Sequence, residues 1–176
     1  MFYPRAKTAF DWPRPILLYV GRVSKEKGIE DFLKLKVAGT KVIIGDGPIR
    51  ERLQLQYLDA KFLGYRKGQA LAECYASADL FVFPSVTDTF GLVLIEALAS
   101  GVPVAAYPVV GPIDIITHPK IGTLDVDLGR AVERALAESD PAVCCQIAQI
   151  YTWENCTRQL LENFVLVQSG MKHENV

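Results

Sequence analysis

The sequence lacks an excess of charge of either sign and also lacks a long apolar run. Its 19 Lys and Arg residues nearly balance its 20 Asp and Glu residues, so the net charge of −1 gives no support for a nucleic-acid partner. No apolar run reaches the length of about 18 residues that indicates a membrane-spanning helix. The N-terminus Met-Phe-Tyr-Pro-Arg lacks the apolar core of a signal peptide. We therefore expect a soluble protein in the cytoplasm.

Cysteine and histidine are too scattered for the usual metal or redox motifs. None of the four cysteines has zinc-knuckle or redox spacing, and Cys144 and Cys145 are adjacent on an expected helix, where their side chains diverge. The two histidines have no third ligand at metal spacing. Asp125 and Asp127 resemble a metal-binding pair, but Asp127 is better explained as the N-cap of the helix that Leu128 opens. We expect reduced thiols and no metal site.

Two common nucleotide-binding motifs are absent as well. No G-x-G-x-x-G follows an expected strand, which excludes the dinucleotide fingerprint. No G-x-x-x-x-G-K-[ST] loop is present, which counts against a P-loop nucleoside triphosphatase.

Short apolar runs alternate with helical patterns along most of the chain. Strands are expected at residues 16–20, 41–44, 61–64, 80–83 and 102–106, with an edge strand at 121–124. Helices are expected between them and, at the end of the chain, at 128–138, 141–150 and 152–168. For a chain of 176 residues this alternation predicts an α/β fold: one doubly wound, Rossmann-like domain with a parallel sheet, helices on both faces and C-terminal helices.

The first residues of the chain differ in composition from this domain. Residues 1–15 are rich in Pro and Arg and predict an extended lead-in that does not pack. The domain is expected to span residues 16–168, followed by a polar tail at 169–176. The last helix carries an apolar stripe, formed by Cys156, Leu160, Leu161, Phe164 and Val165.

Glycine marks the four loops that follow the expected strands, at residues 21–28, 45–48, 64–68 and 84–91. In an open parallel sheet, ligands bind at these carboxyl ends. The first loop carries Arg22, Lys25 and Lys27 near a helix start, which suits an anionic ligand such as a diphosphate, although solvated lysines remain the alternative. The second loop, Gly-Asp-Gly-Pro, is better explained as a structural turn than as a place where a ligand approaches closely.

Glu96 is the only charged residue of an expected helix at residues 92–99. Because the other residues are apolar, this helix is predicted to be buried on all sides. An unpaired buried carboxylate costs several kcal/mol, so Glu96 should have a partner or face a cleft.

The motifs, taken in order, resemble those of a known family. They are Val-Gly-Arg at residues 20–22, Glu-Lys-Gly at 26–28, Gly-Asp-Gly-Pro at 45–48, Phe-Leu-Gly at 62–64, Ala-Ser-Ala-Asp at 76–79, and the stretch from Pro84 to Val104. Together they cover about residues 16–165 and are similar to retaining glycosyltransferases of the GT-B fold, family 4.

This resemblance implies roles for individual residues. Arg22 and Lys27 match the pair that grips the diphosphate of a nucleotide-sugar donor, and Glu96 matches the ribose-binding glutamate. Eight positions before Glu96 the family usually has a glutamate, whereas this chain has Asp88, which is one methylene shorter. The expected catalytic residues are therefore Arg22, Lys27, Asp88 and Glu96. The expected donor-binding residues are Gly21, Gly64, Tyr65, Thr89, Phe90, Gly91 and Leu92.

The resemblance is to half of such an enzyme. Family members have two Rossmann-like domains, and this chain is similar to the C-terminal, donor-binding one. The N-terminal, acceptor-binding domain is therefore expected to be absent here or supplied by a partner subunit. The implied reaction moves a sugar from a UDP- or GDP-sugar with retained anomeric configuration, without metal or cofactor, in the synthesis of cell-envelope polysaccharide or glycolipid. Peripheral attachment to the inner face of the membrane stays open, because many acceptors in the family are lipid-linked.

Two other readings of the same residues stay open. A detached half-enzyme can serve as a non-catalytic nucleotide-sugar-binding module or subunit, because fold alone does not fix function. Another GT-B enzyme, such as a nucleotide-sugar epimerase or a phosphorylase, is the second alternative. A phosphorylase would require a lysine carrying pyridoxal phosphate, and the sequence shows no local signature for one.

Overall fold

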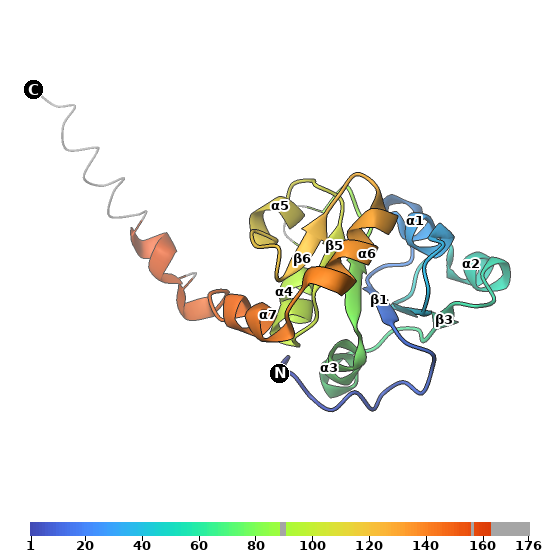
Figure 1. The fold of residues 1–176 in the computed structure, drawn as a ribbon, viewed down its shortest axis with the longest axis horizontal. Coiled ribbons are helices and arrows are strands. Elements are labelled where there is room, and N and C mark those ends of the chain that lie inside the picture. The colour runs from blue at the N-terminus through green and yellow to red at the C-terminus, as the bar shows by residue number, and fades with distance from the viewer. Residues whose placement is uncertain (89–90, 156, 163–176) are drawn as a thin grey trace, which may run out of the picture.

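A six-stranded parallel sheet forms the centre of the computed structural model, which describes residues 1–88, 91–155 and 157–162 (Figure 1). The strands are β1 (Ile16–Val20), β2 (Thr40–Ile44), β3 (Lys61–Phe62), β4 (Leu80–Phe83), β5 (Val104–Ala106) and β6 (Gly122–Leu124). Their spatial order is β3-β2-β1-β4-β5-β6, and every neighbouring pair is parallel. The predicted doubly wound, Rossmann-like fold is confirmed, including the edge position of the last strand.

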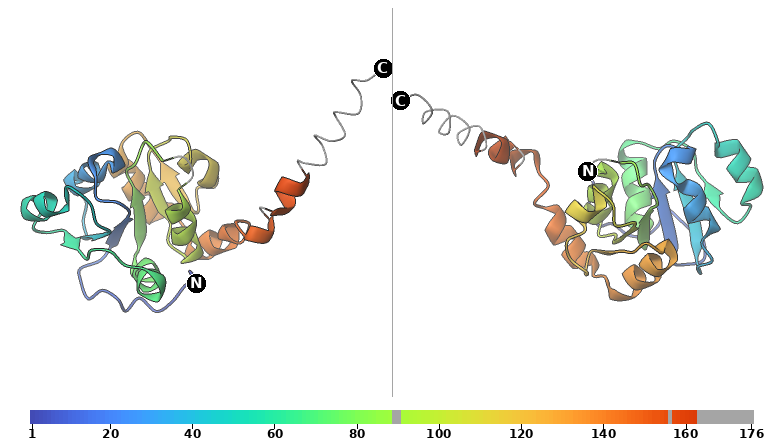
Figure 2. Two further views of the ribbon diagram at one scale, coloured as in Figure 1. Left: turned by 180° about the vertical axis from the view of Figure 1, so that it is seen from behind. Right: turned by 90° about the horizontal axis from the view of Figure 1, so that it is seen from above.

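Helices cover both faces of the sheet, as the two further views in Figure 2 show. One face packs against α3 (Gly68–Ser77), α4 (Leu92–Ala99) and α7 (Pro141–Ala148), with the short α5 (Pro112–Ile115) beside them. The other face packs against α1 (Ile29–Lys34), α2 (Arg50–Gln56) and α6 (Leu128–Glu138). A short 3-10 turn, η1 (Lys25–Lys27), precedes α1.

The central strands are apolar throughout because both of their faces are covered. In β1, Ile16 and Leu18 belong to the core on the α3 side, whereas Leu17 and Tyr19 belong to the core on the α1 side. Full burial of a large apolar side chain contributes on the order of 1.5–3 kcal/mol. The continuous apolar runs, rather than alternating ones, are therefore what a parallel sheet requires.

Residues 1–15 have no helix or strand but do pack on the domain, so the prediction that this segment does not pack is wrong. Phe10 is buried in the core and stacks on Trp12, with ring centroids 5.3 Å apart. Phe2 meets the buried ring of Tyr75 edge-on at 5.5 Å. The sequence did not predict this packing, because the aromatic residues of this Pro- and Arg-rich segment do not follow the spacing of a helix or a strand.

Asp79 joins this lead-in to the sheet. Its carboxylate accepts hydrogen bonds from Lys7, Arg14 and the backbone N–H of Ile16. Burial raises the pKa of Asp79, but the bonds from Lys7 and Ile16 outweigh it and leave the pKa below its ordinary value. The charged carboxylate therefore holds the start of β1 in place.

Asp127 caps α6, as predicted. Its side chain accepts hydrogen bonds from the backbone N–H groups of Gly129 and Arg130, at 2.9 and 3.2 Å. Within residues 1–88, 91–155 and 157–162, no three His, Cys, Asp or Glu side chains gather closely enough to hold a metal ion. The expectation that no metal takes part stays a prediction.

Residues 153–155 and 157–162 are helical and project away from the sheet (Figure 1). Trp153 is 90% exposed, and Leu160 and Leu161 are also exposed. The other three members of the expected stripe, Cys156, Phe164 and Val165, lie outside the described residues, as does the tail at 169–176. Among the helices that the structure describes, none is long and apolar enough to cross a bilayer.

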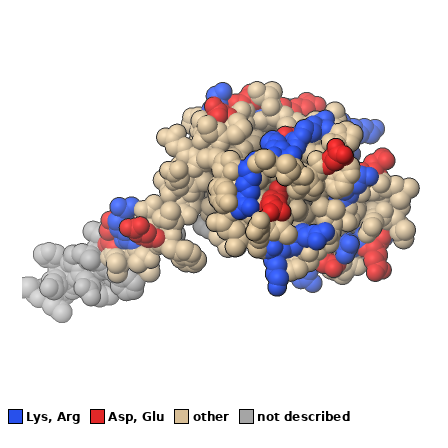
Figure 3. Space-filling model, turned by 90° about the horizontal axis from the view of Figure 1, so that it is seen from below, with Lys and Arg blue, Asp and Glu red and all other residues tan. Residues whose placement is uncertain are grey.

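Charges of both signs are mixed on the surface. On the face that Figure 3 shows, Lys and Arg side chains alternate with Asp and Glu side chains over the globular part of the molecule. This distribution agrees with the near-zero net charge.

Candidate functional site

Two adjoining clefts lie where β1 and β4 end, at the point where the strand order of the sheet reverses. The first has a volume of about 400 Å³ and the second about 600 Å³. Both are lined by Val20, Gly21, Arg22 and Val93. This is the edge of an open parallel sheet at which ligands bind, as expected.

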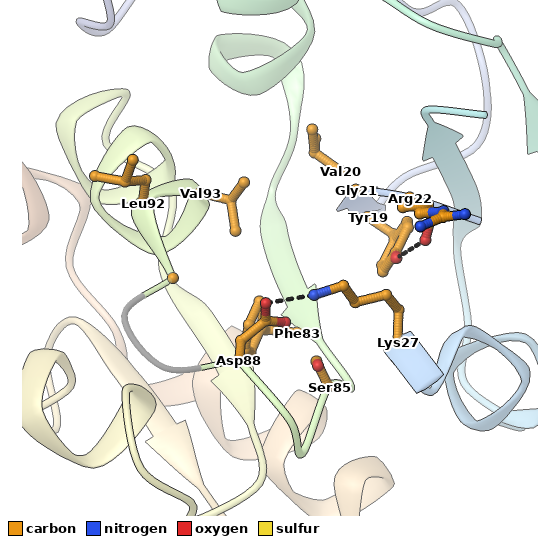
Figure 4. Close-up of a pocket in the computed structure, with 11 residues that line it drawn as sticks. Tyr19, Val20, Gly21, Arg22, Lys27, Phe83, Ser85, Asp88, Leu92 and Val93 are labelled. Atoms are coloured by element: carbon orange, nitrogen blue, oxygen red, sulfur yellow. Dashed lines mark hydrogen bonds and ion pairs between the residues drawn. The ribbon is translucent and has the colours of Figure 1, made fainter. Parts of the chain in front are cut away.

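The first cleft brings together a cation and a carboxylate from distant parts of the chain (Figure 4). Lys27, from η1, forms an ion pair with Asp88, from the loop after β4. Burial raises the pKa of Asp88, but hydrogen bonds from Lys27 and Ser85 outweigh it, so the pKa lies below its ordinary value. The carboxylate of Asp88 is therefore ionised at neutral pH, and each side chain of the pair is about a quarter exposed.

The loop after β1 is held in shape by its own contacts. The Tyr19 hydroxyl donates a hydrogen bond of 2.8 Å to the carbonyl oxygen of Arg22. Burial, and next the nearby charge of Asp88, raise the pKa of Tyr19, so the hydroxyl stays protonated. Arg22 itself is exposed and lines both clefts, which leaves its guanidinium accessible to a ligand that spans them.

Glycine is required in these loops because the backbones touch. A Cβ atom on Gly45 would lie 1.9 Å from the carbonyl oxygen of Gly21, and one on Gly47 would lie 2.3 Å from that of Val23. The N–H of Gly45 also donates to the carbonyl oxygen of Gly64 at 2.9 Å. These contacts support the interpretation of Gly-Asp-Gly-Pro as a structural turn. Gly45 and Asp46 also line the second cleft, so close approach by a ligand stays a prediction.

The second cleft contains Glu96. The partner that its burial demands is Tyr75, whose hydroxyl donates a 2.9 Å hydrogen bond to Glu96 Oε2. Burial raises the pKa of Glu96, and the bond from Tyr75 acts in the opposite direction. Both expectations for Glu96 thus hold at once: it has a partner and it lines a cleft. Nothing in the sequence signals the pairing, which joins α3 to α4.

The N-terminus of α4 borders the first cleft. Gly91 occupies the N-cap position with φ of 70°, and Gly91 and Leu92 both line the cleft. Leu92 is 66% exposed, so the prediction that this helix is buried on all sides is wrong. The helix buries Leu94, Ala97 and Leu98 and presents its first turn to the cleft. Of the other donor-binding residues predicted here, Thr89 and Phe90 lie outside the described residues.

The loop after β3 forms the far wall of the second cleft. Tyr65 lines it and is 71% exposed. Gly64 lies next to it with φ of 70°, and its role is to turn the chain and to bond Gly45. Arg66 and Lys67 follow Tyr65 and also line this cleft, although no motif in the sequence pointed to them.

The lead-in supplies a further part of the second cleft that was not predicted. Met1 and Phe2 line it, together with Leu71 of α3. Lys25, in contrast, is exposed in the loop after β1 and lies outside both sets of lining residues. The structure therefore separates Arg22 and Lys27 from Lys25, which the sequence pattern had grouped together.

Comparison with known proteins places this site in a family. Residues 4–127 match the family model described as glycosyl transferases group 1. The chain belongs to this family. The predicted family resemblance is confirmed, and this group 1 chain includes in its matched range all of the candidate site residues named above from Gly21 to Glu96.

Relatives of this group 1 chain share its sequence at moderate identity. The GDP-mannose-dependent alpha-mannosyltransferase of Mycobacterium tuberculosis is 45% identical over 113 residues, covering 63% of this chain and 30% of the relative. The protein of the same name from Corynebacterium glutamicum is 39% identical over 163 residues, covering 86% and 40%. The structure of sucrose-phosphate synthase from Thermosynechococcus elongatus superposes with a TM-score of 0.71 at 29% identity, covering 96% and 50%. The chain thus spans half or less of the length of these relatives.

Proposed function

We propose that this chain binds the nucleotide-sugar donor of a glycosyltransferase. The observation that carries the proposal is the meeting of Arg22, Lys27 and the N-terminus of α4 at the first cleft. Two cationic side chains and the positive end of a helix dipole suit a diphosphate, which carries negative charge that backbone N–H groups can also bind. The family assignment makes a nucleotide-sugar the natural source of that diphosphate.

The two clefts divide the donor between them in this proposal. The diphosphate lies at Arg22, which borders both clefts, and the sugar lies in the first cleft near Asp88. The nucleoside lies in the second cleft, with its ribose hydroxyls at Glu96 and its base toward Tyr65. The volumes of about 400 and 600 Å³ suit a ligand of this size.

GDP-mannose is the donor that we propose to test first. Two relatives at 45% and 39% identity carry the name GDP-mannose-dependent alpha-mannosyltransferase. A UDP-sugar is the natural comparison, because GDP and UDP share the ribose and the diphosphate that Glu96 and Arg22 are proposed to contact.

We further propose that transfer of the sugar requires a second domain that carries the acceptor. The chain spans 30% and 40% of the two mannosyltransferases, and its clefts open at the edge of the sheet. In the reaction, negative charge grows on the departing phosphate while the sugar keeps its anomeric configuration. Preorganised donors at Arg22, Lys27 and the α4 amides would stabilise that charge most in the transition state. The isolated chain should therefore bind donor without transferring its sugar.

Isothermal titration calorimetry with GDP and UDP tests the donor site. We expect the wild-type chain to bind GDP, and Arg22→Ala to weaken binding by about 20-fold, because a charge-assisted hydrogen bond contributes roughly 1.5–3 kcal/mol. Lys25→Ala is the matched control, since it removes the same charge from the same loop outside both clefts. Equal losses for the two variants would indicate a nonspecific effect of charge and would contradict the proposed site.

A further inference from the structure

We propose that Tyr75 is a positioning residue for Glu96, holding its carboxylate at the angle that receives the ribose hydroxyls of the donor. This inference rests on the proposed function and deepens it. Tyr75 belongs to none of the sequence motifs described above. It lies on α3 and is not among the residues that line the second cleft.

The ring of Tyr75 is held in place by burial and by two aromatic neighbours. It is fully buried, meets Phe2 edge-on at 5.5 Å and packs against Phe81 at 5.6 Å. Its hydroxyl points out of this aromatic cluster to Glu96 Oε2, 2.9 Å away. A ring held this firmly cannot follow a moving carboxylate, so the hydrogen bond fixes Glu96 rather than the reverse.

The geometry leaves Glu96 able to bind a ligand. An ionised carboxylate offers about four acceptor positions on two oxygens, and Tyr75 uses one of them. Glu96 lines the second cleft, so its remaining positions are available to hydroxyl donors there. A carboxylate already aligned by Tyr75 loses less conformational freedom when the ribose binds.

Residues 1–15 also contact Tyr75. Phe2 both lines the second cleft and packs on Tyr75. The segment before β1 therefore contributes Met1 and Phe2 to the nucleoside site, and Phe2 also packs on Tyr75, which in turn packs on Phe81.

The first test needs no ligand. Carboxyl-detected NMR follows the titration of Glu96 in the wild-type chain and in Tyr75→Phe. Loss of the hydroxyl removes a bond that lowers the pKa of Glu96, so we expect the midpoint to move to higher pH. Other ionisable groups around this cleft are unchanged in the variant; they are the amino group of Met1, Arg22, Asp46, Tyr65, Arg66 and Lys67. Tyr107→Phe, which removes a tyrosine-to-Asp31 bond elsewhere, should leave the midpoint unchanged.

The second test measures whether this bond serves the ribose. Calorimetry compares GDP with 2′,3′-dideoxy-GDP for wild type, Tyr75→Phe, Glu96→Gln and Tyr107→Phe. We expect loss of the ribose hydroxyls to weaken wild-type binding by about tenfold and Tyr75→Phe binding by about threefold or less. As the pH is lowered, Tyr75→Phe should begin to lose affinity for GDP at a higher pH than wild type does. Glu96 becomes protonated sooner in the variant, and a protonated carboxyl group accepts hydrogen bonds less well. Thermal unfolding checks that each variant is folded.

The outcomes separate the two proposals. If wild type binds GDP and Tyr75→Phe shows the wild-type discrimination and pH profile, Tyr75 is only structural and this inference is overturned, while the donor site stands. If a folded wild-type chain binds neither GDP nor UDP, the proposed function is overturned and the role of Tyr75 fails with it.

Discussion

Replacing Lys27 by alanine is expected to weaken GDP binding by about 100-fold. The variant loses a charge-assisted hydrogen bond to the diphosphate, and the diphosphate is then repelled by the carboxylate of Asp88. The Lys27 ammonium is already paired with Asp88. Its removal therefore takes a cation from the diphosphate and also leaves an uncompensated carboxylate beside it. Calorimetry at fixed ionic strength measures the change. Stability should fall by less than about 1 kcal/mol, because the pair is partly exposed.

A second variant separates these two causes. Lys27→Ala combined with Asp88→Asn removes the repulsion but not the lost cation, so about tenfold of the affinity should return. If Lys27→Ala binds GDP as well as Lys25→Ala does, Lys27 is a partner of Asp88 only and does not contact the donor. The same comparison reports on Asp88, whose shorter side chain departs from the glutamate that the family usually has.

Gly45→Ala is expected to lower the free energy of unfolding by about 3 kcal/mol, through backbone strain and a steric clash. Gly45 has φ of 135°, and its new Cβ would lie 1.9 Å from the carbonyl oxygen of Gly21. The overlap is between two backbones, so no side chain can swing away to relieve it. Chemical denaturation of the purified variant gives the measurement.

Gly68→Ala is the matched control for this effect. Gly68 also has a positive φ, of 58°, but a Cβ there meets nothing within 4 Å. Its substitution should cost only about 1 kcal/mol, from the left-handed conformation alone. Equal costs at the two positions would show that the close approach of the loops after β1 and β2 does not matter for stability.

Much of the fold could be predicted because its causes are local. Apolar runs such as Ile16–Val20 and Leu80–Phe83 have the length and composition of strands covered on both faces, and glycine marks their ends. Asp127 was predicted as a cap from its place before a helix. The packing of residues 1–15 could not be predicted, because it depends on Phe10 and Phe2 meeting side chains that are far away in sequence.

The candidate site shows the same division. Glu96 drew attention because a lone carboxylate in an apolar helix has an energetic cost that demands a reason. The identity of its partner, Tyr75, depends on how α3 lies against α4, and no spacing rule contains that information. Likewise, Lys25 and Lys27 are the same type of residue in the same loop, so the sequence does not distinguish them. The fold places Lys27 in the first cleft with Asp88 and leaves Lys25 outside it.

The most direct test of the central claim is a titration of the ¹⁵N-labelled wild-type chain with GDP-mannose, followed by two-dimensional NMR. The donor-site account predicts shifted amide signals at residues 21–28 and 91–96, where the loop after β1 meets the start of α4. A second hollow lies at the opposite ends of the strands, where Lys7 and Arg14 are paired with Asp79. Shifts confined to that hollow, or none at millimolar donor, would contradict the account.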